Sequence, residues 1–267
     1  MKKLSIFAVA IAAMAFTACG GNKNAQPAQD TESEKSFEQE QVEAKIKLEL
    51  DSLASAVGQL KQLPFVQETE DGLKLTDEEK QVKPDYLLDP ATAENAATLS
   101  EKYRMISALG VDKRIAQMYE MPTEDYEKAI TKLVADINDP SFKDVENSSS
   151  IFETTQKLYD SMNANARINY FWQLAATSLV EELYIMNQNA DKFITAFDDE
   201  SASNVTYRIA LLIDAVDRLA SYDPEIEPVA EAIAPLSVLN AISVDQLKSQ
   251  LAEAKDQIVA ARTALTK

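Results

Sequence analysis

The sequence predicts an all-α protein: a multi-helix bundle of antiparallel amphipathic helices around one central apolar helix, with at most one small β-hairpin. Glycine is scarce, with five in 267 residues, whereas tight turns between strands often need glycine to reach positive φ angles. Good helix formers such as Ala, Leu, Glu, Lys and Gln are abundant. Apolar residues also recur at steps of three and four along most of the chain. We expect about two-thirds or more of the folded part to be helical, against about one-third in an average protein.

The first expected helix covers residues 37–63 and ends at Pro64. Its apolar side chains recur at steps of three and four and form one stripe: Val42, Ile46, Leu50, Leu53, Val57 and Leu60. Residues 65–75 follow as a small hairpin with Asp71-Gly72 at its turn, or as a loop.

The acidic stretch 68–94 matches a calcium-binding loop only in part. In that register Gly72 and Glu78 occupy the glycine and last-ligand positions, but Gln67 and Thr69 stand where carboxylates are needed. We therefore expect a solvated acidic connector here, with no metal ion and no cofactor.

The next helix is expected over residues 91–110, because Gly110 is of a type favoured just beyond helix C-termini. A short second piece covers residues 111–121. Thr123 then caps a helix that ends before Pro140.

Residues 141–150 form the most loop-like internal stretch. They would divide the helical domain, residues 37–267, into two halves at 37–140 and 150–267. A helix over residues 151–162 opens the second half.

The most apolar helix of the chain is expected at residues 166–186. A helix that is apolar nearly all round is surrounded by other helices, so Trp172 should be packed among side chains from several neighbours. Its polar residues advance by four and form one narrow seam, which serves either the core or a ligand: Asn169, Gln173, Thr177 and Glu181.

The C-terminal third adds shorter helices. Residues 191–197 make a turn or two, and Ser201 or Ser203 opens the helix that follows. Ser243 begins the last helix, with Gln246 three residues on as in a capping box.

Composition excludes several classes of site. The chain has no histidine and one cysteine, which rules out Ser-His-Asp and Cys-His catalysis and the common His/Cys zinc sites. Its formal net charge of −18 repels nucleic acid phosphates, so no nucleic acid partner is expected.

Two groups of acids are candidates for a catalytic pair or a cation site. Glu181 and Glu182 point about 100° apart on a helix and cannot act on one bond. We expect a structural role instead: Glu181 lies on the polar seam, and Glu182 pairs with a neighbouring helix. The candidate partners are Arg104, Arg167, Arg208 and Arg218. The run Asp198-Asp199-Glu200 precedes a helix, where acids stabilise the positive end of the dipole.

The N-terminus has the order of a secretory signal peptide over residues 1–18. Lys2 and Lys3 precede an apolar run that is too short to span a bilayer, and Thr17-Ala18-Cys19 follows. This stretch resembles the signal of bacterial lipoproteins, with Phe16 where leucine is usual. The resemblance implies that Cys19 is acylated and becomes the new N-terminus. Residues 19–36 would then form a disordered tether.

Two triplets resemble the Asp-Ser/Thr-apolar acceptor of O-glycosylation in Bacteroidota. They are Asp51-Ser52-Leu53 and Asp160-Ser161-Met162, which makes Ser52 and Ser161 candidate modification sites.

The sequence therefore predicts a protein of the cell envelope, lipid-anchored to the outer membrane on its periplasmic face or at the cell surface. Its expected function is non-catalytic: binding or scaffolding of an envelope protein, a peptide or a glycan through a groove between helices. The alternative is a carboxylate-dependent hydrolase of envelope or dietary polymers, which needs no histidine. Convergent acids in an open cleft would favour the enzyme.

Overall fold

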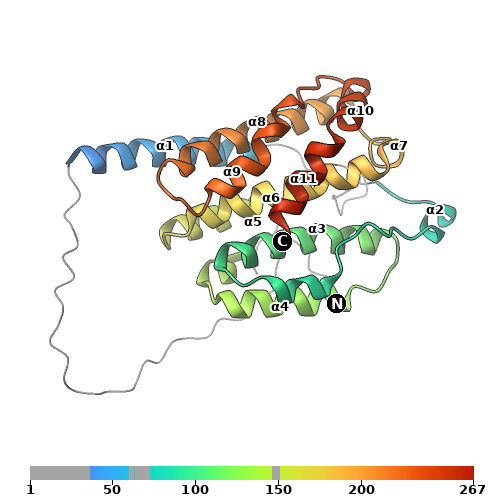
Figure 1. The fold of residues 1–267 in the computed structure, drawn as a ribbon, viewed down its shortest axis with the longest axis horizontal. Helices are drawn as coiled ribbons and strands as arrows, with labels where there is room; N and C mark the ends of the chain where they lie inside the picture. Colours follow the sequence, from blue (N-terminus) through green and yellow to red (C-terminus); the bar gives the residue numbers. More distant parts are fainter. Residues whose placement is uncertain (1–36, 60–62, 64–72, 146–150) are drawn as a thin grey trace, which may run out of the picture.

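The computed structural model describes residues 37–59, 63, 73–145 and 151–267 (Figure 1). These residues contain helices and no strand, so the all-α prediction is confirmed. The first group of helices is α1 (Phe37–Gln59), α2 (Asp77–Gln81), η2 (Pro90–Asn95), α3 (Leu99–Met118), α4 (Glu124–Ile137) and η3 (Pro140–Val145). The second group is α5 (Ile151–Ala164), α6 (Ile168–Gln188), α7 (Ala190–Phe193), α8 (Asp199–Ala220), α9 (Glu227–Ile233), η4 (Ala234–Val238), α10 (Val244–Glu253) and α11 (Lys255–Leu265).

Helix α6 is the central helix, as its apolar sequence predicts. It contacts α3, α5, α8, α9, α10 and α11, and in Figure 1 it runs between α8 and α9 on one side and α3 and α4 on the other. Trp172 is fully buried, with edge-to-face ring contacts to Phe171 and Tyr159. A helix with this much apolar surface is stable only when neighbours cover it in this way.

The buried apolar residues form one cluster that extends from Leu50 in α1 to Leu265 in α11. The most extensive helix pair in it joins α3 to α6. The two stretches 37–140 and 150–267 thus share a single core.

Side chains cap the starts of α3 and α10, whereas the side chain of Thr123, the expected cap of α4, makes no cap hydrogen bond. Thr98 and Glu101 form a reciprocal capping box at α3, and the Ser243 hydroxyl accepts from the Gln246 amide at α10. The predicted start of α8 at Ser201 or Ser203 is wrong. Asp198 is the cap instead: its carboxylate accepts from the Ser201 amide at 2.8 Å, since an extended acidic residue can satisfy the free amides of the first turn.

The predicted break at Gly110 is also wrong, because α3 continues through it to Met118. A glycine inside a helix costs about 1 kcal/mol, whereas each buried aliphatic side chain contributes about 1.5–3 kcal/mol. Burial of Leu109, Val111 and Ile115 therefore outweighs the glycine. The helix ends where Glu120 takes a left-handed φ of 52°.

Several expectations fall outside the described residues. They are the signal peptide, Cys19, the tether, the Asp71-Gly72 turn and the end of the 141–150 loop. Among the helices that are described, none is both long and apolar enough to cross a membrane.

Candidate functional site

The polar seam of α6 lies inside the bundle. Its four residues have at most 8% of their surface exposed: Asn169, Gln173, Thr177 and Glu181. Gln173 accepts a hydrogen bond from Arg104 Nη1 at 3.0 Å and donates one to Ser100 Oγ at 3.2 Å. Arg104 also donates from Nε to the carbonyl of Leu265, at the end of α11, at 3.1 Å. The seam therefore joins α6 to both α3 and α11.

The strongest contact of the seam is between Glu181 and Arg262 of α11. Arg262 Nε lies 2.9 Å from both carboxylate oxygens of Glu181, and Nη2 lies 2.7 Å from Oε1. The guanidinium carbon lies 3.8 Å from the centre of the Tyr184 ring. Glu181 is fully buried, so this charge-assisted pair supplies the partner that a buried carboxylate needs.

A second buried carboxylate, Asp112 of α3, lies beside this pair. Its Oδ2 accepts from the Leu88 amide at 2.7 Å and lies 3.7 Å from Arg262 Nη2. Burial, followed by the negative charge of Glu181, raises the pKa of Asp112 well above its usual value. Its Oδ1 is buried and accepts no hydrogen bond. A proton on Asp112 would let this atom act as a donor and would leave the three side chains with no net charge.

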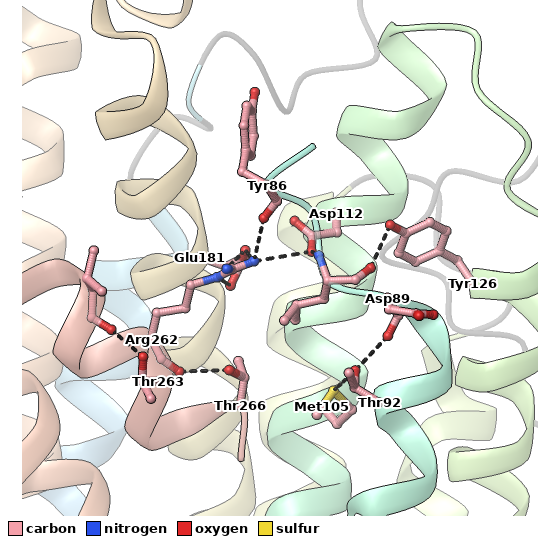
Figure 2. Close-up of polar contacts among 12 residues, drawn as sticks. Tyr86, Asp89, Thr92, Met105, Asp112, Tyr126, Glu181, Arg262, Thr263 and Thr266 are labelled. Atoms are coloured by element: carbon pink, nitrogen blue, oxygen red, sulfur yellow. Dashed lines mark hydrogen bonds and ion pairs between the residues drawn. The ribbon is translucent and has the colours of Figure 1, made fainter. Parts of the chain in front are cut away.

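This cluster holds an irregular segment, residues 83–89, which we call the strap (Figure 2). Pro84 lies at its start and Pro90 directly follows it, and a residue that precedes proline is disfavoured in a helix. Arg262 donates to the Tyr86 carbonyl at 3.2 Å. Leu88 is fixed on both sides: Asp112 accepts from its amide, and the Tyr126 hydroxyl donates to its carbonyl at 2.8 Å.

The strap and η2 form one wall of a groove, and α4 forms the other. The groove has a volume of about 600 Å³. Its apolar lining comes from Pro84, Leu87, Leu88, Pro90, Ala91, Ala93, Met121, Pro122, Tyr126, Ala129 and Leu133. Its charged lining comes from Asp85, Asp89, Glu94, Asp125, Lys128 and Lys132. It combines apolar surface with a few charges, as binding clefts commonly do.

A second hollow of about 590 Å³ lies between α9 and α11. It is lined largely by alanines and prolines, with Glu231 and Asp256 among its charged residues. The hydrogen bonds and ion pairs given above for the Glu181–Arg262–Asp112 cluster reach no residue that lines it.

The other sequence-based candidates are separate from the groove. Glu182 pairs with Arg208 of α8, one of the expected arginines, at 3.7 Å. Ser52 is exposed on α1, and its hydroxyl donates to the Leu48 carbonyl. Ser161 is half-buried on α5. In the described ranges, no three acids gather in a way that could hold a metal ion.

Sequence reasoning missed the partners of Glu181. Arg262 was not among the expected arginines, and Asp112 was not considered as a site residue. Arg262 lies 81 residues from Glu181 in the chain, so no local spacing connects them. An available signal was the position of both charged residues on otherwise apolar helix faces.

Comparison with known proteins adds no relative: no family model, no curated protein and no solved structure matches this chain.

Proposed function

We propose that this protein is a lipid-anchored, non-catalytic binding module of the bacterial cell envelope. Its groove between the strap and α4 would take a segment of a partner polypeptide. The observation that carries the proposal is the fixed strap. Side chains from three helices, Asp112, Tyr126 and Arg262, hold this irregular segment against the bundle. Because this wall is already ordered, the protein loses less conformational entropy when a partner binds.

The lining favours a polypeptide over a glycan. Tyr126 is the only aromatic among the described residues that line the groove, and 7% of its surface is exposed. Its hydroxyl is already bonded to Leu88. The groove therefore offers a sugar no open aromatic face, whereas aliphatic and proline side chains suit the apolar residues of a peptide.

The paired acids Asp112 and Glu181 do not favour the alternative of a hydrolase. A carboxylate-dependent hydrolase needs an acid and a second carboxylate that both reach the substrate. Asp112 and Glu181 have 0% of their surface exposed. Arg262 occupies both oxygens of Glu181, and the Leu88 amide occupies Oδ2 of Asp112. Their arrangement favours a structural role, which is to hold the strap, over a catalytic one.

The anchor is supported by the signal-like order of residues 1–18 and by Cys19, the only cysteine. It is tested by expressing wild-type protein and the Cys19→Ala variant in a bacterial host. Wild type should sediment with membranes and carry an acylated N-terminal cysteine by mass spectrometry. The variant should be released or remain an uncleaved precursor. Unmodified wild-type protein would contradict the anchor.

The groove is tested by selecting a phage-displayed random peptide library on the purified body. Ala129→Glu should abolish binding of the enriched peptides, because Ala129 lines the groove. Ala264→Glu is the matched control, since Ala264 lines the hollow between α9 and α11. Failure to enrich any peptide that Ala129→Glu blocks would refute the proposed groove function.

A further inference from the structure

The charges around the groove are not paired equally on its two walls. Lys128 of α4 pairs with Asp125 at 2.9 Å, and Lys132 pairs with Asp136 at 3.4 Å. All four residues belong to α4, so the two lysines are already neutralised by their own helix.

The opposite wall carries acids without partners. Asp85 on the strap and Glu94 on η2 are both exposed and line the groove. Neither makes a hydrogen bond or an ion pair with any residue that the structure describes. Asp89, between them, caps η2 by accepting from the Ala91 amide at 2.9 Å. The strap wall thus presents two uncompensated negative charges next to an apolar floor.

Resting on the proposed function, we propose that the groove selects a polypeptide segment whose apolar residues are flanked by Lys or Arg. The apolar residues would enter the groove between Leu88 and Leu133, and the basic residues would lie against Asp85 and Glu94. The rest of the chain adds to this preference, because its formal net charge of −18 attracts basic segments and repels acidic ones.

A divalent cation is the competing ligand for two free acids. It is disfavoured because no group of three acids that could hold a metal ion occurs in the described part of the chain. The apolar lining between the walls also gives a metal ion no ligands, whereas it gives a peptide side chain a place to be buried.

The experiment uses the same peptide library and the double variant Asp85→Asn/Glu94→Gln. Peptides that depend on the groove should be enriched in Lys and Arg beside apolar residues. Exposed ion pairs contribute about 0.2–1 kcal/mol each, so the double variant should weaken the best such peptide by about 2- to 30-fold. Replacing its basic residues with glutamate should abolish binding. Glu231→Gln/Asp256→Asn makes the same charge change at the other hollow and should leave the affinity unchanged.

The outcomes separate this inference from the proposed function. If peptides are blocked by Ala129→Glu but show no basic enrichment, or bind the double variant as tightly as wild type, the charge selection is refuted and the groove function stands. If no peptide depends on Ala129, the groove function itself fails. The melting temperature of the double variant should match that of wild type, because neither Asp85 nor Glu94 makes a hydrogen bond or an ion pair within the described part of the chain.

Discussion

Replacing Asp112 tests whether this residue is a neutral acid in the folded protein. In Asp112→Asn, the amide oxygen can still accept from the Leu88 amide, and the amide nitrogen is a donor, as the hydroxyl of a protonated carboxyl is. We expect this variant to lose less than about 1 kcal/mol of stability. Asp112→Ala leaves the buried Leu88 amide without an acceptor. An unsatisfied buried donor costs about 1–3 kcal/mol, and the lost side chain adds a small cavity.

The assay is urea denaturation at pH 7, followed by far-ultraviolet circular dichroism. If Asp112 were instead an ionised partner of Arg262, Asp112→Asn would break a buried ion pair at about 3–5 kcal/mol. Equal losses for the asparagine and alanine variants would therefore refute a neutral Asp112.

The pH dependence gives a second readout of the same residue. The folded pKa of Asp112 is raised above its ordinary value of 3.8. Its contribution to stability is therefore full below 3.8 and is lost as the pH rises through the folded pKa. Asparagine does not titrate, so wild type should lose stability relative to Asp112→Asn as the pH rises.

Three further predictions follow from single residues. Trp172→Ala should lower the free energy of unfolding by about 3–5 kcal/mol. The fluorescence of native Trp172 should be blue-shifted and poorly quenched by acrylamide, whereas red-shifted, easily quenched emission would show that Trp172 lies in an open site. Gly110→Ala should raise stability by about 0.5–1 kcal/mol, since a Cβ there meets nothing within 4 Å; a lower melting temperature would contradict this. Burial, against the opposing charge of Arg208, raises the pKa of Glu182 from 4.5 to about 6. That stabilising contribution is present below pH 4.5 and is lost as the pH rises through 6. The free energy of unfolding of wild type should therefore fall by about 2 kcal/mol relative to that of Glu182→Gln between pH 4.5 and 7.5. Parallel pH profiles of the two free energies would refute the raised pKa.

Local signals predicted the helices and the central role of α6. The apolar character of residues 166–186 indicates a surrounded helix whatever its neighbours are, and Ser243 with Gln246 indicates a start without any tertiary contact. Gly110 was misread because helix propensity is a small energy. A cost of about 1 kcal/mol is decisive in an isolated peptide but is outweighed when both flanks of the glycine are buried.

The candidate site was only partly predictable. The seam could be recognised because Glu181 and its polar companions follow the helical period. Its function could not, because Arg262 and Asp112 belong to other helices and meet Glu181 only in the folded bundle. The strap could not be predicted either, because its backbone hydrogen bonds to Asp112, Tyr126 and Arg262 depend on the tertiary structure. The sequence of residues 83–89 indicates only a proline-containing connector.

The most direct test of the groove as the binding site is methyl NMR of the body, labelled at Ala, Leu and Met, during titration with the tightest selected peptide. We predict that the largest shift changes occur at Leu88, Met121 and Ala129, which line the groove. Changes centred on Ala232 and Ala260, in the hollow between α9 and α11, would contradict the account.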